Sequence, residues 1–315
     1  MNNYQNVRCC VCNQDATGGA VILHRAYSLN VHDEFSIVTC KNCGFVYQNP
    51  RPDSDLLKNY YTETYEQIGN PDKGIIAKAA YIPDFVKDLY KYLTGDYTVY
   101  LKNYFSGTVI DIGCGFGNLM ESLIKMGCTV SGIDSSKVAV EACLQKGLKV
   151  TETTLESMSF EENSYDTIVL SHVVEHIENV QEAFRKIFRA MKPAGNLIII
   201  CPNYQSFAHK MFGDYWFGMH LPFHLYHFDR NSIKKFLEIS GFETRLIKTI
   251  NLEMGYTESL KIQFQAKNRK IFNILFRVFY KYNIVIRPIM MFLLKLHELF
   301  FKNNGDVLIA VASKP

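Results

Sequence analysis

Four cysteines near the N-terminus have the spacing of metal ligands. Cys9 and Cys12 form one C-x-x-C pair, and Cys40 and Cys43 form a second. Each pair places two sulfurs on one tight turn, and four thiolates can share one tetrahedral Zn²⁺ ion. Because four sulfurs leave no open position for water or substrate, we expect a structural zinc that contributes folding energy. The alternative is four unrelated buried thiols.

Three histidines lie close together among aromatic residues in the segment 215–228. They are His220, His224 and His227. Histidine is the side chain whose ordinary pKa, ~6.5, suits a general base near neutral pH. We expect His224 to be the base, with His220 and His227 as further candidates. The alternative is that all three pack around the loop and transfer no proton.

A glycine-rich turn lies in the middle of the chain, at Asp111-Ile112-Gly113-Cys114-Gly115-Phe116-Gly117. Glycines let the backbone approach a ligand without Cβ clashes, and the start of the following helix would face that ligand. Asp134 comes about twenty residues later, where a carboxylate can accept hydrogen bonds from ribose hydroxyls. The turn and the acid together predict a nucleotide-type cofactor, although an NAD enzyme would share both.

Alternating apolar runs and amphipathic windows predict the elements that carry these residues. Strands are expected at Thr108–Ile112, Thr129–Asp134, Val150–Thr153 and Tyr165–Ser171. This alternation is the pattern of a parallel sheet with helices on both faces. Such a sheet would bring the ends of its strands, and so the glycine turn and Asp134, to one edge.

The strand order, continued by residues 172–177 and 191–200, resembles the class I S-adenosylmethionine (SAM)-dependent methyltransferases over about residues 108–250. The resemblance implies an α/β fold with a Rossmann-like seven-stranded sheet and SAM as the cofactor. To that core the chain would add a small N-terminal zinc module and a helical C-terminal insertion.

The resemblance also implies roles for individual residues. The glycine turn would bind the methionine part of SAM, the acid ending the second strand the ribose, and the loop after the third strand the adenine. The end of the fourth strand would border the pocket, whereas Glu175 and His176 would be mainly architectural. The predicted cofactor-binding residues are Asp111, Gly113, Gly115, Gly117, Asp134, Leu155, Glu156, Ser171 and His172.

The whole chain resembles bacterial methyltransferases that act on nucleotide-linked sugars and surface-glycan precursors. Those enzymes often carry the same C-x-x-C pairs, a tyrosine-rich lead-in such as residues 60–65, and a histidine at the position of His224. Tyr61 of the lead-in is therefore a further catalytic candidate. Sugar C-methyltransferases have Glu-His where this chain has Phe223-His224, so both O- and C-methylation stay open.

Other functions fit parts of the pattern. A quinone or phenolic O-methyltransferase would suit the aromatic loop, and some RNA base methyltransferases carry an N-terminal zinc module. No Asn-Pro-Pro-Tyr-type motif follows the fourth strand, where the chain reads Ser171-His172-Val173-Val174. We therefore expect a small-molecule substrate and no nucleic-acid partner. A scaffold that binds the cofactor without turnover is the non-enzymatic alternative.

The composition is that of an ordinary globular protein, with 48% hydrophobic residues, 21% charged residues and a net charge of +3. The N-terminus lacks the pattern of a secretory signal, which predicts a cytoplasmic location. Charged residues interrupt the apolar C-terminal segment, so no stretch reaches the roughly 18 apolar residues of a membrane span.

The basic charge is concentrated near the C-terminus, where residues 259–303 carry nine basic residues and one acidic residue, Glu298. Pro288 as a break predicts two amphipathic helices in this segment. A basic amphipathic helix can rest on an anionic membrane, here at the inner face, which would suit a lipid-linked substrate. A lid over the active site or a homodimer contact through residues 258–303 is the alternative.

These observations divide the chain into five parts. We expect a zinc module with its lead-in at 1–60, a helical cap at 61–107 and the SAM-binding core at 108–257. The basic helical insertion would span 258–303, and the last strand of the core sheet would span 304–315.

Overall fold

The computed structural model describes residues 3–15, 19–26, 33–67, 97–267 and 283–315. Its centre is a seven-stranded sheet with the order β12-β13-β10-β9-β6-β7-β8. Neighbours from β10 to β8 are parallel, and β13 is antiparallel to both β10 and β12. The strands are β6 Thr108–Ile112, β7 Thr129–Asp134, β8 Val150–Glu152, β9 Tyr165–Ser171, β10 Met191–Pro202, β12 Glu243–Ile250 and β13 Val307–Ser313. The predicted α/β sheet is confirmed.

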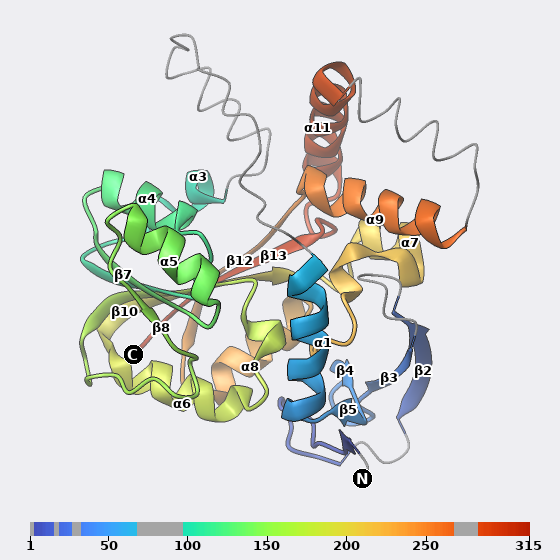
Figure 1. Ribbon diagram of the computed structural model, residues 1–315, viewed down its shortest axis with the longest axis horizontal. Helices are drawn as coiled ribbons and strands as arrows, with labels where there is room; N and C mark the ends of the chain where they lie inside the picture. The colour runs from blue at the N-terminus through green and yellow to red at the C-terminus, as the bar shows by residue number, and fades with distance from the viewer. Residues whose placement is uncertain (1–2, 16–18, 27–32, 68–96, 268–282) are drawn as a thin grey trace.

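Helices cover both faces of this sheet (Figure 1). Helices α3 (Thr98–Leu101), α4 (Asn118–Lys125) and α5 (Lys137–Gln145) share one apolar core with the sheet. Helices α6 (Val180–Ala190) and α8 (Arg230–Ile239) pack on the opposite face. The amphipathic pattern of α6 explains its place, because its buried residues recur at helical spacing: Val180, Ala183, Phe184, Ile187 and Ala190.

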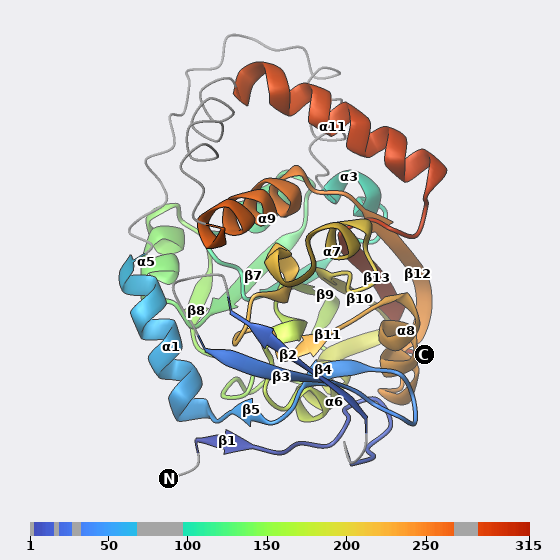
Figure 2. The ribbon, with the colours of Figure 1, turned by 90° about the vertical axis from the view of Figure 1, so that its right-hand side faces the viewer.

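The N-terminal residues form a second, smaller sheet with the order β11-β4-β3-β2. Its strands are β2 Ala20–Arg25, β3 Glu34–Thr39, β4 Val46–Gln48 and β11 Tyr226–His227, and a separate pair joins β1 Tyr4–Gln5 to β5 Arg51–Pro52. Helix α1 (Ser54–Gln67) follows. Figure 2 shows these strands lying against the central domain. The N-terminal sheet shares a hydrophobic core with the central domain, since Cys9, Phe45 and Tyr47 belong to the same buried cluster as residues of α6 and α8.

Between β10 and β12 the chain forms short elements that surround the histidines. They are α7 (Phe207–Phe212), the 3₁₀ helices η3 (Gly213–Tyr215) and η4 (Phe217–Met219), and then β11. A further 3₁₀ helix, η2 (Val174–His176), follows β9 and contains Glu175 and His176. Strand β11 pairs with β4, as Tyr226 lies opposite Tyr47 and His227 opposite Val46. The segment expected to be an aromatic loop therefore ends in the N-terminal sheet.

The C-terminal segment differs from its prediction in two respects. Helix α9 (Glu253–Ala266) begins five residues before the expected boundary, and helix α11 (Asn283–Phe300) continues through Pro288. The prediction that Pro288 breaks the helix was wrong: a proline there removes one backbone hydrogen bond and crowds the carbonyl one turn earlier, but the contacts of the residues that follow it hold α11 together. Arg269, Lys270, Arg277 and Lys281, and most of the expected cap at 61–107, lie outside the described residues.

Candidate active site

The glycine turn joins β6 to α4 in a left-handed conformation. Gly113, Gly115 and Gly117 have φ values of +70°, +51° and +78°, a backbone region that residues with a Cβ rarely adopt. A Cβ on Gly113 would lie 2.5 Å from the Val173 side chain, whereas one on Gly115 would meet nothing within 4 Å. The backbone at Gly115 thus leaves open space above the carboxyl end of β6.

Two carboxylates stand beside this turn. Asp134 accepts the backbone N–H of Gly115 and that of Ser136, each at 2.8 Å, so it holds the turn in place and retains capacity for a ligand. Asp111 is buried, and its Oδ1 has no hydrogen-bond partner among the described residues. Burial, followed by the charge of Asp134, raises the pKa of Asp111 to about 7. A buried acceptor without a donor fits the amine of an amino-acid-like ligand.

The remaining predicted cofactor residues lie along the same edge of the sheet. Leu155 is buried and Glu156 is exposed, both just beyond β8. Ser171 ends β9 and its hydroxyl lies 3.1 Å from the Tyr97 hydroxyl. His172 follows with a φ of +57°. The structure therefore brings the predicted residues from β6, β7, β8 and β9 to the carboxyl ends of the parallel strands, where open α/β sheets bind ligands.

A pocket of about 340 Å³ opens at the ends of β9 and β10. Two of the three predicted histidines, His220 and His224, line it together with His172 and His176. His227 lies elsewhere: it is buried in β11, and its ring centroid lies 5.5 Å from that of Tyr204 with the two planes tilted by 42°. The other lining residues are Pro202, Trp216, Phe217, Gly218, Leu252, Met254, Gly255, Asp306 and Val307.

The pocket imidazoles are tightly packed and held by backbone carbonyls. His224 Nδ1 lies 2.8 Å from the carbonyl of Gly218, and His176 Nδ1 lies 3.0 Å from that of Phe223. The two rings meet edge to face at 4.6 Å. Burial, with a contribution from the neighbouring imidazoles, lowers the pKa of His220 to about 3 and the pKa of His224 well below its ordinary value. Both rings are therefore neutral at physiological pH.

Sequence reasoning missed one acidic residue near the site, Asp306, and expected another, Glu175, to be mainly architectural. Glu175 is 1% exposed and lies next to His176, while Asp306 lines the pocket from the residue before β13. Asp306 accepts the Leu252 backbone N–H at 2.7 Å, and burial raises its pKa to about 7. The sequence signal for Asp306 was its position directly before the last strand. That strand is antiparallel to its neighbours, so it starts at the edge of the sheet where the parallel strands end.

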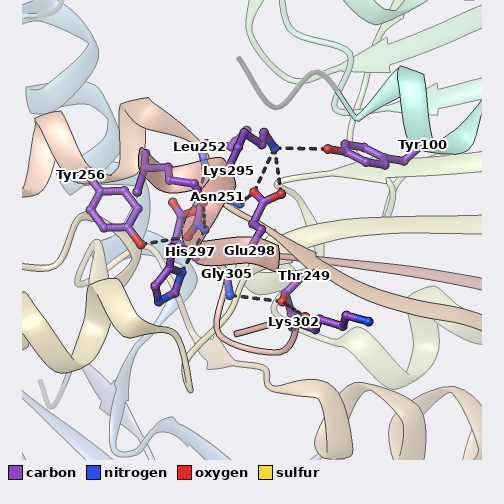
Figure 3. A network of polar contacts seen from close by, with 12 residues as sticks. Tyr100, Thr249, Asn251, Leu252, Tyr256, Lys295, His297, Glu298, Lys302 and Gly305 are labelled. Atoms are coloured by element: carbon purple, nitrogen blue, oxygen red, sulfur yellow. Dashed lines mark hydrogen bonds and ion pairs between the residues drawn. The ribbon is translucent and has the colours of Figure 1, made fainter. Parts of the chain in front are cut away.

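A polar network fixes the wall of the pocket beneath α11 (Figure 3). Lys295 donates to both carboxylate oxygens of Glu298 at 2.9 Å and to the Tyr100 hydroxyl at 3.2 Å. Glu298 also accepts the backbone N–H of Asn251. Since Lys295 and Glu298 are almost fully buried, this network fastens α11 to the end of β12 and sets the place of the lining residue Leu252.

The four N-terminal cysteines converge as their spacing predicts. Cys9 and Cys43 sulfurs are 3.5 Å apart, as are those of Cys12 and Cys40, and all four lie within 4.8 Å of one another. A tetrahedral Zn²⁺ with ~2.3 Å bonds would hold its sulfurs about 3.8 Å apart. Tyr61 lies on α1, and its side chain is outside the described part of the structure. Among the described helices, none has the length and apolar character to cross a membrane.

A family comparison decides what this arrangement belongs to. The sequence profile of a methyltransferase-domain family matches residues 81–247, just over half of the chain. The chain belongs to this methyltransferase family. The match agrees with the glycine turn and the seven-stranded sheet, the two features from which a methyltransferase domain was expected.

Individual relatives of the methyltransferase match over shorter stretches. A ubiquinone biosynthesis O-methyltransferase of Vibrio parahaemolyticus is 33% identical over 106 residues, which cover 31% of this chain and 45% of that protein. The protein of the same name from Bartonella tribocorum is 27% identical over 160 residues, covering 47% of this chain and 63% of that one. The methyltransferase thus spans less than two thirds of the length of these relatives.

Among solved structures, a SAM-dependent methyltransferase from Archaeoglobus fulgidus aligns with the methyltransferase at a TM-score of 0.48 and 20% identity. The alignment covers 74% of this chain and 100% of that one.

Proposed function

We propose that this methyltransferase transfers the methyl group of SAM to a hydroxyl oxygen of a small aromatic acceptor, with an imidazole of the pocket as general base. The observation that carries the proposal is the 340 Å³ pocket at the ends of β9 and β10, lined by His220 and His224. Methyl transfer from a sulfonium is an in-line displacement, so the protein must align the acceptor oxygen and take up its proton.

The cofactor would lie along the edge formed by β6, β7 and β8. Asp111 would accept hydrogen bonds from the amine of the methionine part, and Asp134 would accept those of the ribose hydroxyls. Leu155 would contact the adenine, and Ser171 with His172 would separate the cofactor from the acceptor pocket. SAM supplies the activated methyl group when it is bound in this position.

The chemistry of the pocket favours a phenolic hydroxyl. Its walls are mainly apolar, with Trp216, Phe217 and Met254 available to pack against a flat ring. An imidazole with a lowered pKa is a weak base. A phenol ionises near pH ~10, whereas an aliphatic hydroxyl, like water, ionises only at far higher pH, so a weak base removes the phenolic proton at a much lower cost in free energy. The names of the relatives from Vibrio and Bartonella agree with this acceptor class.

A sugar hydroxyl, in a nucleotide-activated sugar or a glycan precursor, is the second candidate. The observation in its favour is the set of polar groups around the pocket, Asp306 and the histidines, which could bind several hydroxyls at once. Sugar recognition would also agree with the resemblance of the cysteine module and the tyrosine-rich segment around Tyr61 to sugar methyltransferases.

Formation of S-adenosylhomocysteine with catechols, quinols and nucleotide sugars as acceptors tests the proposal. We expect turnover with the phenolic set, and at least a tenfold loss in His224→Ala with cofactor affinity unchanged. Lys234→Ala, which changes an exposed residue of α8 outside the pocket, is the control. Turnover with nucleotide sugars alone would move the acceptor to the second class, and unchanged turnover in His224→Ala would remove this residue from the mechanism.

We propose further that Cys9, Cys12, Cys40 and Cys43 bind one structural Zn²⁺, since their four sulfurs are already grouped within 4.8 Å. The division into a zinc module at 1–60, a cap at 61–107, a core at 108–257 and 304–315, and an insertion at 258–303 also remains a proposal.

The insertion is proposed as a contact surface, either for an anionic membrane or for a second copy of the chain. Exposed apolar residues on and just after α11 support this role: Ile289, Phe292, Leu293, Leu299, Phe300 and Phe301. Sedimentation with anionic vesicles at low salt tests the membrane contact, and sedimentation equilibrium without vesicles tests the dimer. Both contacts would be overturned by a protein that is monomeric and stays in the supernatant when the vesicles pellet.

A further inference from the structure

A buried carboxylate behind the acceptor pocket lacks the donors that such a group requires. Glu175 is 1% exposed, and within the described part of the chain neither of its carboxylate oxygens has a hydrogen-bond partner. The nearest cationic candidate is His172, whose Nδ1 lies 3.5 Å from Oε1. An ionised carboxylate without donors is costly to bury, so this position calls for a positive charge.

Two imidazoles next to Glu175 are prepared to act as ligands. The Nδ1 atoms of His176 and His224 face the backbone carbonyls of Phe223 and Gly218, which only accept hydrogen bonds. Each Nδ1 therefore carries the proton, and each Nε2 keeps its lone pair. A hydrogen bond from one ring nitrogen to a carbonyl is how proteins orient histidines that bind metals through the other nitrogen.

The three side chains also lie close enough to share one ion. One ligand atom from each of Glu175, His176 and His224 lies within 4.8 Å of the others. His176 and His224 line the pocket, so an ion between them would be open to the acceptor on that side. Two imidazoles and one carboxylate form the donor set of open divalent transition-metal sites, which keep positions for a substrate oxygen.

We propose that Glu175, His176 and His224 bind a divalent transition-metal ion that contacts the acceptor hydroxyl. The ion neutralises Glu175 and acts as a Lewis acid, which lowers the pKa of a hydroxyl oxygen that coordinates it. With His224 as a ligand, the proton of that hydroxyl passes to His220, which lines the same pocket. The catalytic part of this inference rests on the proposed function, whereas binding of the ion does not.

Cobalt binding to the full-length protein tests the site directly. The protein is dialysed against a mild chelator, which leaves a tetrathiolate zinc in place, and is then titrated with Co²⁺. We expect one Co²⁺ per chain with weak visible d–d bands and without the intense sulfur-to-cobalt absorption that thiolate ligands produce. A wild-type protein that binds no Co²⁺ beyond the cysteine cluster would overturn the proposal.

Matched variants assign the ligands. Glu175→Gln keeps the shape of the side chain and removes the charge, and we expect at least about tenfold weaker Co²⁺ binding. Glu182→Gln, on the exposed face of α6, is the control and should bind as the wild type does. Equal affinity in Glu175→Gln and wild type would count against the site. His224→Ala provides the same comparison if Glu175→Gln does not fold.

The two proposals fail in different ways. Stoichiometric Co²⁺ binding without methyl transfer to any hydroxyl acceptor would overturn the proposed function and leave the metal site standing. Methyl transfer to phenols by the chelated, metal-depleted protein at the full rate would overturn the role of the ion and leave the acceptor class standing.

Discussion

At the scale of single residues, the cofactor side of the site follows from short-range pattern and the acceptor side does not. The glycine turn and Asp134 lie on consecutive strands, so their relation could be predicted from spacing. Glu175 and Asp306 come together with His224 only through packing across more than 100 residues of chain. A sequence shows that such residues exist, but their burial depends on which strand neighbours which.

The first prediction concerns Gly113. Gly113→Ala combines a φ of +70° with a Cβ only 2.5 Å from the Val173 side chain, so we expect a loss of ~1–3 kcal/mol in stability and weaker cofactor binding. Gly127→Ala has a φ of +88° but open space around its Cβ, and it therefore isolates the backbone strain. Thermal unfolding and calorimetric titration with S-adenosylhomocysteine measure both effects. Equal losses in the two variants would contradict the proposed steric conflict.

At the scale of elements, the parallel strands and their helices could be predicted because each is specified by its own periodicity. Strand β11 could not, because it has two residues and exists only through its partner β4, which lies far away in the sequence. The continuation of α11 through Pro288 was also missed. There the local sequence favours a helix break, but the buried contact between Lys295 and Glu298 outweighs the local cost of a proline.

The buried pair on α11 gives a prediction at this scale. Lys295→Met leaves the Glu298 carboxylate, which is 13% exposed, without its cationic partner, so we expect a loss of ~3 kcal/mol in stability. The matched control is Lys261→Met, because Lys261 forms a partly exposed pair of the same three-residue separation with Glu258 on α9 and should change stability by less than ~1 kcal/mol. Urea unfolding provides the comparison. The interpretation fails if both variants lose the same amount.

The cysteine cluster gives a second prediction for elements. If the cluster holds the proposed zinc, Cys12→Ser should release it, lower the melting temperature and reduce methyl transfer, because β4 of the same module holds β11 at the end of the histidine segment. Affinity for S-adenosylhomocysteine should stay unchanged, since its residues lie on β6 and β7. Cys128→Ser, a thiol outside the cluster, should retain the metal. Elemental analysis measures the zinc content, and calorimetry measures the melting temperature and the cofactor affinity. A Cys12→Ser protein that keeps its zinc would contradict the prediction.

At the scale of the whole molecule, titration of buried groups sets the pH dependence of stability. Burial lowers the pKa of six histidines, His176, His209, His220, His224, His227 and His297, so the unfolded chain binds more protons and stability is lost as pH falls below ~6.5. The pKa values of Asp111 and Asp306, each raised to about 7, act in the opposite direction between pH ~4 and 7.

We expect the histidines to dominate the pH dependence of stability, because six histidines with lowered pKa values oppose two carboxyl groups with raised pKa values. The melting temperature should therefore fall on acidification from pH 6.5 to 4.5 and change little between pH 7.5 and 8.5. Scanning calorimetry in buffers of equal ionic strength measures this profile. A melting temperature that rises on acidification would mean that the two carboxyl groups dominate.

The pairing of Tyr47 with Tyr226 has a consequence for the order in which the protein is made. All four cysteines leave the ribosome early, so the proposed zinc site can assemble while most of the chain is still untranslated. The edge of β4, in contrast, stays without its neighbour until residues 226–227 emerge. During that interval the exposed edge is a place where another nascent chain could pair. Synthesis of the histidine segment therefore closes this edge against aggregation before the last pocket-lining residues are made.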